Sequence, residues 1–343
     1  MQNEIVLSVV IPVFNEEEVL PMLEQRLSSA LAELDTSSYE IVCVNDGSLD
    51  GSVKILRDWS SRDSHVVLLN LSRNFGHQAA ITAGLHAARG QCVVIMDADL
   101  QDPPELIAEM LRRWREGYQV VVAERRSRAE RGLRRLLFDM FYWTLHAISD
   151  YPLQLQSGVF GLMDRRVVKS LVAMPERSRF IPGMRSWLGF KQCSVLYDRA
   201  DRSVGDPKQT FGRLLHYGLD AIFSFSYKPL RLIFAIGSFI SALCFAYALI
   251  LVIMRILQIN VVRGFTTPTV SILFLGGLQL VAMGILGEYL ARIYDEIKGR
   301  PLFVVNDMIR DGSIYHPDTP IPLARENPLR ATSQGSSKET GLL

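Results

Sequence analysis

The segment that organises this chain is Gln91-Cys-Val-Val-Ile-Met-Asp-Ala-Asp-Leu-Gln-Asp-Pro-Pro104. Its apolar part, Cys92 to Met96, has the length of a buried strand, and the two prolines at its end prevent a strand from continuing. Asp97 and Asp99 alternate with Ala98, so both side chains can turn toward one bound ion. A buried strand that releases acids at its carboxyl end is typical of the ligand crevice of an open α/β sheet. The alternative is a solvated turn whose acids cap a helix beginning near Pro103.

Carboxylate oxygens are the ligands that Mg²⁺ and Mn²⁺ prefer, and such ions usually also hold substrate phosphates. Asp97 and Asp99 are therefore the candidate metal ligands, with Mg²⁺ or Mn²⁺ as the expected cofactor.

Strand and helix patterns alternate through the first 125 residues. Apolar runs of strand length occur at 6–13, 41–44, 66–71, 92–96 and 119–123, and helical patterns occur at 16–34, 50–62, 75–88 and 103–116. This alternation predicts an α/β fold with a mostly parallel sheet flanked by helices on both faces. No Gly-x-Gly-x-x-Gly follows the first strand, which argues against a dinucleotide-binding fingerprint.

Polar residues follow several of the expected strands. The first strand ends in Asn15-Glu16, the second in Asn45-Asp46, and the fourth in the two aspartates already named. Because the carboxyl ends of parallel strands meet at one edge of a sheet, we expect these side chains to converge. Asp46 is suited to accept the N–H of a uracil or a ribose hydroxyl; the alternative is that it caps the turn before Gly47.

The composition excludes some classes of protein. The chain has 343 residues, room for two domains or for one domain and a membrane part. Its formal net charge of +1 gives no general attraction to nucleic acid. The four cysteines are not spaced as a metal site, and we read them as buried residues in a reducing compartment. The N-terminus lacks the order of features that marks a signal peptide.

A basic segment follows the last of these strands, with six arginines between Arg125 and Arg135. An amphipathic stretch rich in aromatic residues comes next, at 133–148. One interpretation is a solvated loop before a core helix. We favour a helix at the membrane surface, with arginines toward anionic headgroups and aromatic rings in the interface. A second interface helix is expected at 210–225.

Two segments have the character of membrane spans. Leu232 to Met254 and Phe265 to Gly287 each contain 23 residues and no charge. As helices they are about 35 Å long, enough for a hydrocarbon core of about 30 Å. The short link between them predicts a hairpin, and the flanking Lys and Arg residues favour both termini on the cytoplasmic side. Glycines in the second span allow close helix approach, within one chain or in a homo-oligomer.

Three motifs resemble those of the family 2 glycosyltransferases: Val10-Ile-Pro-Val-Phe-Asn-Glu16, Val44-Asn-Asp-Gly-Ser48 and Asp97-Ala-Asp-Leu-Gln-Asp-Pro-Pro104. More narrowly, they look like those of the polyisoprenyl-phosphate glycosyltransferases, bacterial relatives of dolichol-phosphate mannose synthase. The resemblance runs from about residue 6 to about residue 305. It implies a GT-A fold, a nucleotide-sugar donor and a divalent metal. The residues it implies for the nucleotide pocket are Pro12, Asn15, Glu16 and Asp46; those for the metal and diphosphate are Asp97 and Asp99, with Gln101 close by.

The resemblance also implies an acceptor side. Arg125 and Arg128 match arginines near the acceptor phosphate, and Arg202 and Lys208 match a basic segment that binds phosphate of donor or acceptor. The segment from Gln156 to Arg165 departs from the family: many relatives carry an aspartate, a candidate base, at the position of Gln156, and often polar or basic residues at Val159 and Gly161. A phosphate monoester is mostly dianionic at neutral pH, so such an acceptor needs positioning more than deprotonation.

We therefore expect an inverting hexosyltransferase at the cytoplasmic face of the cell membrane. It would move a sugar from a nucleotide-sugar, such as UDP-glucose, to a polyisoprenyl phosphate such as undecaprenyl phosphate, giving a lipid-linked sugar for the cell envelope. The expected parts are a catalytic domain at 1–205, a juxtamembrane interface helix at 206–229, a transmembrane hairpin at 230–294 and a cytoplasmic segment at 295–343, disordered from about residue 311.

Two alternatives remain open. A processive polysaccharide synthase has the same fold, but it usually carries Gln-x-x-Arg-Trp, which Arg185-Ser186-Trp187 does not match, and it usually has more spans. A catalytically silent membrane scaffold that binds lipid phosphate or nucleotide is consistent with Gln156.

Overall fold

The computed structural model describes residues 5–34, 38–125, 157–177, 179–197 and 266–316, with eight isolated helical residues between 237 and 253. The chain divides into two units. The first comprises Met1–Glu130, Leu153–Lys208 and Arg300–Leu343, and the second comprises Arg131–Pro152 and Gln209–Gly299. The sheet and the candidate site belong to the first unit.

Four parallel strands form the centre of the sheet: β1 (Leu7–Val13), β2 (Tyr39–Asn45), β3 (Val66–Leu71) and β4 (Cys92–Ile95). They lie in the order β3-β2-β1-β4, and nearly all of their side chains are buried. The chain proceeds from β1 through β2 to β3 on one side and only then crosses to β4 on the other side of β1. The carboxyl ends of β1 and β4 therefore flank a topological switch point, where open α/β sheets bind ligands.

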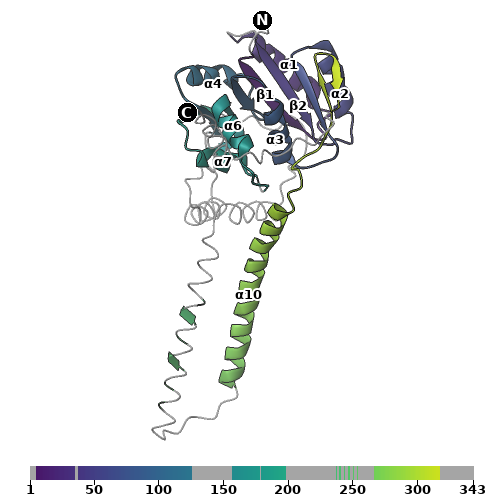
Figure 1. Ribbon diagram of the computed structural model, residues 1–343. Coiled ribbons are helices and arrows are strands. Elements are labelled where there is room, and N and C mark those ends of the chain that lie inside the picture. Colours follow the sequence, from purple (N-terminus) through teal and green to yellow (C-terminus); the bar gives the residue numbers. More distant parts are fainter. Residues whose placement is uncertain are drawn as a thin grey trace, which may run out of the picture. The chain divides into compact units, whose positions relative to one another are not determined.

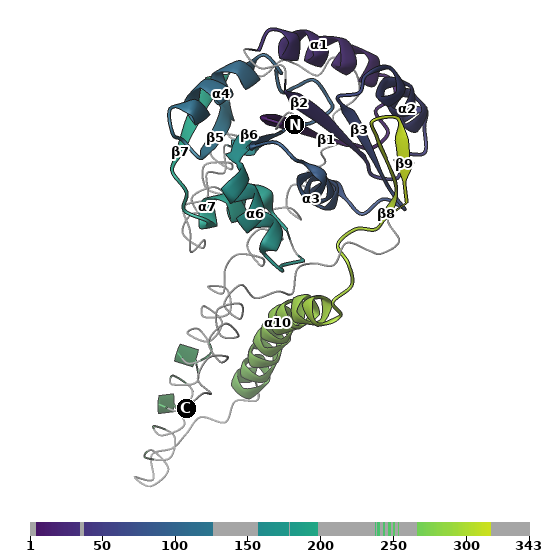
Figure 2. The ribbon, with the colours of Figure 1, turned by 45° about the horizontal axis from the view of Figure 1, so that its top comes forward.

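Helices cover both faces of this sheet (Figure 1, Figure 2). One face carries α1 (Leu20–Ala32), α2 (Ser52–Arg62) and α4 (Leu106–Arg115), and the other carries α3 (His77–Ala87), α6 (Arg165–Ala173) and α7 (Ile181–Trp187). The helix α3 packs closely on β1, since a Cβ atom on Gly84 would lie 2.3 Å from Val10 Cγ1. This contact fixes the helix whose first residue reaches the candidate site.

Further strands extend the sheet on both sides. β6 (Ser157–Asp164) is antiparallel to β4 and to β5 (Val120–Arg125), and β7 (Gln192–Tyr197) is parallel to β5 at one edge. At the other edge β8 (Val305–Arg310) is antiparallel to β3, and β9 (Ser313–Tyr315) is antiparallel to β8 (Figure 2). The nine-stranded sheet is thus mixed: seven strands run in one direction, as expected of a mostly parallel sheet, and β6 and β8 run against them. β6 and β8 can run against the other strands because a long stretch of chain precedes each of them, and such a stretch does not require the parallel crossover of a β-α-β unit.

The predicted α/β alternation of the first 125 residues is confirmed. The first helix begins at Leu20 rather than at Glu16, because residues 17–19 form a turn. β9 lies beyond residue 311, where disorder was expected to begin, so the C-terminal segment adds two strands to the sheet instead of remaining separate. Residues 317–343 lie outside the described part of the chain.

A row of buried polar side chains ties β8 to the centre of the sheet. Asn45 Nδ2 donates to Asn70 Oδ1 at 3.1 Å, and Asn70 Nδ2 donates to Asp307 Oδ1 at 2.6 Å. Each of the three residues is 4% exposed. Buried polar side chains of this kind keep their positions because breaking one of these hydrogen bonds would leave a buried donor or acceptor unpaired, which is strongly unfavourable. The row therefore links the segment after residue 300 to the strand end that carries Asp46.

The second unit contains the helix α10 (Thr266–Ile297). Of the helices in the described ranges, none is both long enough and apolar enough to cross a membrane. The first expected span, at 232–254, is described only at isolated residues, and the expected interface helices at 133–148 and 210–225 lie outside the described residues.

Candidate functional site

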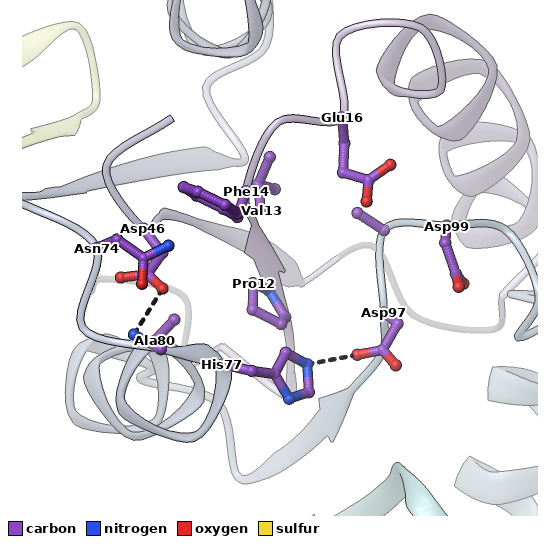
Figure 3. Close-up of a pocket in the computed structure, with 12 residues that line it drawn as sticks. Pro12, Val13, Phe14, Glu16, Asp46, Asn74, His77, Ala80, Asp97 and Asp99 are labelled. Carbon is purple, nitrogen blue, oxygen red and sulfur yellow. Dashed lines mark hydrogen bonds and ion pairs between the residues drawn. The ribbon is translucent and has the colours of Figure 1, made fainter. Parts of the chain in front are cut away.

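A cavity of about 250 Å³ lies at the carboxyl ends of the central strands (Figure 3). It is lined from β1 and its loop, from the residue that follows β2, from the segment leading into α3 and the first turn of α3, and from the loop after β4. The switch point between β1 and β4 thus coincides with a real cavity. The lining residues are Pro12, Val13, Phe14, Glu16, Asp46, Asn74, Gly76, His77, Ala80, Asp97, Ala98 and Asp99.

The strand ends converge as the sequence predicted for Pro12, Glu16, Asp46, Asp97 and Asp99, all of which line the cavity. In Figure 3, Pro12 lies between Asp46 on one side and Asp97 on the other. The arrangement places carboxylates at two separate ends of one space. Such a space suits an elongated ligand with a polar group at each end.

Asp46 holds one wall of the cavity in place. Its Oδ1 accepts the amide N–H of Phe75 at 2.7 Å, and its Oδ2 accepts the amide N–H of Gly76 at 2.9 Å. Burial raises the pKa of the Asp46 carboxyl, and these two bonds and the nearby His77 and Arg73 oppose that rise. The carboxylate keeps further lone pairs toward the cavity. Asp46 therefore anchors the loop between β3 and α3 as well as lining the space.

Asn15 performs a structural task rather than lining the cavity. Its φ is 55°, in the left-handed region that asparagine tolerates better than most residues. Its Oδ1 accepts the amide N–H of Leu49 at 2.8 Å, and its own amide donates to Ser48 Oγ at 3.1 Å. These bonds hold the loop after β1 against the loop after β2. The structure thus assigns Asn15 to loop geometry and leaves Phe14 and Glu16 to line the cavity.

The three acids between Asp97 and Asp102 have two different roles. Asp97 and Asp99 line the cavity, and Asp99 Oδ1 also accepts the amide N–H of Gln101 at 3.1 Å. The third acid, Asp102, is buried and accepts the hydroxyl of Tyr197 at 2.8 Å. Gln101 is not among the lining residues. Two carboxylates of the motif face the site, and the third holds β7 to the loop.

His77 is a lining residue with an ionisable side chain that the sequence analysis missed. It is the first residue of α3, and its Nε2 lies 2.8 Å from Asp97 Oδ1 (Figure 3). Burial lowers the pKa of the imidazole, but the hydrogen bond to Asp97 and the charges of Asp97, Asp46 and Asp99 outweigh it, so the pKa of His77 is raised. The signal available in the sequence was position: residues 72–77 follow the third strand, whose end was not considered.

The donor set fits a hard divalent cation. The described residues contain no cluster of three or more acid, histidine or cysteine ligands. Mg²⁺ is commonly bound by one or two carboxylates together with substrate phosphates, without a complete protein cage. Asp97 and Asp99 supply two such carboxylates at one end of the cavity.

The acceptor-side segment forms β6, which lies beside β4 in the register Ile95 to Gly161. The start of β6 is therefore adjacent to the loop that carries Asp97. A Cβ atom on Gly161 would lie 2.7 Å from the Val121 carbonyl oxygen and 3.3 Å from Arg185 Nη1. Arg185, which is 3% exposed and whose pKa burial lowers to about 10, occupies the space behind this glycine. The departure at Gly161 thus has a steric reason.

Of the residues predicted to bind phosphate, the structure describes the position of Arg125 alone. Arg125 is the last residue of β5, at the same edge of the sheet as the cavity. Arg128, Gln156, Arg202 and Lys208 lie outside the described residues.

Two family models match the chain. Residues 8–171 match Glycosyl transferase family 2, and residues 228–293 match the GtrB C-terminal hairpin. An uncharacterized glycosyltransferase of Synechocystis is 45% identical over 303 residues, covering 88% of this chain and 95% of that protein. This chain belongs to glycosyl transferase family 2. The family resemblance inferred from the three motifs is confirmed.

Other members of glycosyl transferase family 2 carry more specific names. A prophage bactoprenol glucosyl transferase homolog of Escherichia coli is 40% identical over 300 residues, covering 87% of this chain and 98% of that protein. Among solved structures, glucosyl-3-phosphoglycerate synthase from Mycobacterium tuberculosis has 19% identity and a TM-score of 0.44, covering 64% of this chain and 77% of that one. A likeness of that size carries no argument about function.

Proposed function

We propose that this chain transfers a sugar from a nucleotide-sugar to a polyisoprenyl phosphate. The observation that carries the proposal is the convergence of Glu16, Asp46, Asp97 and Asp99 on one cavity at the switch point of the sheet. It is supported by relatives of nearly equal length that are named bactoprenol glucosyl transferases. The proposed donor is a UDP-sugar, with UDP-glucose the first to test.

The proposed donor lies along the cavity. The end formed by Pro12, Phe14 and Asp46 receives the nucleoside, and the end formed by Asp97 and Asp99 receives the diphosphate. Mg²⁺ or Mn²⁺ would be held by Asp97 and Asp99, and the chemistry supplied there is neutralisation of charge on the leaving diphosphate. Glu16 also lines the cavity. These residues bind and orient the donor before the acceptor arrives.

The proposed step is a single displacement with inversion. An oxygen of the acceptor phosphate bonds to the anomeric carbon, the bond from that carbon to the diphosphate breaks, and its electron pair leaves with the nucleoside diphosphate. A dianionic phosphate needs no base for this attack, so the step does not depend on an aspartate at position 156. Arg125, Arg128, Arg202 and Lys208 are the proposed phosphate ligands, since guanidinium and ammonium groups suit that anion.

We also propose that the segment at 230–294 is a transmembrane hairpin, which brings the site to an acceptor that stays in the bilayer. The support is two uncharged stretches of 23 residues and the match to a C-terminal hairpin model. The catalytic unit and both termini would lie on the cytoplasmic face, where nucleotide-sugars are made. A homo-oligomer built on the span glycines belongs to the same proposal.

A silent scaffold is the second candidate, because Gln156 stands at the position where the family resemblance implies an aspartate as the candidate base. An assay on full-length protein in vesicles containing undecaprenyl phosphate, with labelled UDP-sugars and Mg²⁺ or Mn²⁺, distinguishes the transferase from the scaffold. Transfer predicts label in a lipid that mild acid cleaves. Nucleotide binding without labelled lipid would support the scaffold, and label in a polymer would support a processive synthase.

The variant Asp99→Asn tests the role of the motif. It removes one negative charge at the diphosphate end and keeps the shape of the side chain. We expect transfer to fall by about 10²–10³-fold, the effect of removing one group that stabilises developing charge, with an unchanged melting temperature. Full transfer by this variant in excess chelator would refute the metal role.

A further inference from the structure

His77 is held in place on both sides by contacts that do not involve its ring. The two preceding amides, of Phe75 and Gly76, are bonded to Asp46, and Gly76 adopts a φ of 97° at the N-cap. The helix that His77 begins is buried from Ala79 to Leu85 and touches β1 through Gly84. The ring therefore extends from a rigid base into the cavity. Asp97, in contrast, lies on the loop that follows β4.

The bond between the two side chains leaves part of Asp97 available. His77 Nε2 lies 2.8 Å from Oδ1, so the second oxygen, Oδ2, is free of this bond and can face a ligand. Among the described residues that line the cavity, His77 alone has a basic side chain, beside four carboxylates. A hydrogen bond to one oxygen of a ligating carboxylate fixes its orientation, and such partners strongly affect metal affinity.

We propose that His77 is a positioning residue, which holds the Asp97 carboxylate so that its free oxygen faces the cation and diphosphate of the donor. The inference rests on the proposed function, because it presumes that Asp97 meets a donor-bound cation. It assigns to the first turn of α3 a part in donor binding at the diphosphate end, while the loop before it holds its contact with Asp46.

Three substitutions separate the hydrogen bond from the ring. His77→Ala removes both. His77→Gln places an amide nitrogen near the position of Nε2 and keeps the donor, whereas His77→Asn is too short to reach Asp97. His65 supplies a matched control, because its Nδ1 lies 2.7 Å from Asp63 Oδ1 and its side chain is 43% exposed, against 46% for His77. His65 is not among the cavity residues.

The measurement is equilibrium binding of Mn²⁺ in the presence of UDP, followed by electron paramagnetic resonance on full-length protein without acceptor. We expect His77→Ala and His77→Asn to weaken Mn²⁺ binding by about 10–100-fold, His77→Gln to remain within about threefold of the parent, and His65→Ala to match it. Turnover is not needed for this readout. Melting temperatures check that each variant is folded, and the Gln and Asn pair decides the matter if the alanine variant unfolds.

The outcomes distinguish the two proposals. If the parent protein binds Mn²⁺ with UDP and His77→Ala binds equally well, the positioning role is refuted and the proposed function stands. If His77→Gln binds Mn²⁺ as weakly as His77→Ala does, restoring the hydrogen-bond donor does not restore binding, and the inference is also refuted. If the parent binds no Mn²⁺ with UDP, the metal part of the proposed function fails and the inference fails with it.

Discussion

Gly47 illustrates how a single residue sets the geometry beside the cavity. It follows Asp46 directly and has a φ of 69°. A Cβ atom there would lie 2.6 Å from the backbone carbon of Arg73 and from the backbone nitrogen of Asn74. The loop after β2 and the loop after β3 are thus in backbone contact at this point. Any side chain at 47 must push away the segment that leads to His77.

The substitution Gly47→Ala is expected to weaken UDP binding and to destabilise the protein. The left-handed backbone alone disfavours alanine by about 1–2 kcal/mol, and the contact with the Arg73 backbone adds to this. Gly117→Ala is the control, because Gly117 has a φ of 93° with nothing near its Cβ position. Thermal melting and UDP titration of both variants check the prediction. Equal stability and equal UDP affinity in the two variants would contradict it.

The sequence predicted the residues of the site that stand at strand ends and missed those that depend on loop paths. Glu16, Asp46, Asp97 and Asp99 were predicted because parallel strands bring their carboxyl ends together, and Pro12 was predicted from the family resemblance. Asn15 and Gln101 belong to the same motifs but do not line the cavity, since side-chain direction in a loop has no periodicity. His77 was missed because a histidine in the first turn of a helix is an ordinary residue until the fold places it beside Asp97.

At the scale of elements, α3 connects two parts of the molecule. Its first turn lies at the site, and its last turn lies near the C-terminal segment. His86 lies 5.8 Å from Phe303, ring centre to ring centre, in an edge-on arrangement. Burial, with a smaller contribution from Arg179, lowers the pKa of His86 to about 4. The folded protein therefore keeps this imidazole neutral at pH values where an unfolded chain would protonate it.

This pKa predicts a loss of stability in mild acid. The folded pKa is below the unfolded value of about 6.5, so the unfolded state binds more protons between these values. Stability from His86 is complete above about pH 6.5 and declines as the pH falls toward 4, by at most about 1.4 kcal/mol per pH unit. Melting of His86→Gln and of the parent protein between pH 7.5 and 5 isolates the effect. A variant whose melting temperature falls as steeply as the parent's would contradict the prediction.

The elements beyond residue 125 resisted prediction for a physical reason. β8 carries Asp307 and Arg310, which are both nearly fully buried, whereas a hydropathy pattern predicts that charged residues are exposed. They are buried because each has a partner elsewhere in the sheet: Asn70 for Asp307, and Glu40, 3.5 Å away, for Arg310. β7 is a half-exposed edge strand and gives only a weak pattern. The first strands were easier because their residues are almost all apolar.

At the scale of the whole molecule, the first unit is discontinuous. It begins with β1 and is completed by β8 and β9, after a long stretch assigned to the second unit. Removing the last strands would uncover the edge of β3, and it would leave Glu40 and Asn70 without partners on β8. Strand edges and buried charges without partners both favour aggregation or unfolding.

Two truncations test this dependence. A chain ending at residue 299 loses both strands, and we expect a loss of about 3–5 kcal/mol, the effect of removing one partner of a buried ion pair, or roughly 10 °C in melting temperature. A chain ending at residue 316 keeps both strands and is expected to melt like the full chain. The comparison uses purified proteins in one detergent. Equal melting of the two truncated chains would show that β8 and β9 do not stabilise the sheet.

The position of β8 in the sequence also bears on biosynthesis. Asn70 can form its hydrogen bond to Asp307 only after Asp307 has been synthesised, 237 residues later. Once β4 has been made, a nascent chain has β1 to β4 available but no cover for β3 until β8 is translated, so residues 209–299 of the second unit are synthesised while the sheet is still incomplete. The sheet can therefore be completed only after synthesis has passed β9, and release of the chain before β8 has been made would yield a protein in which the edge of β3 is uncovered.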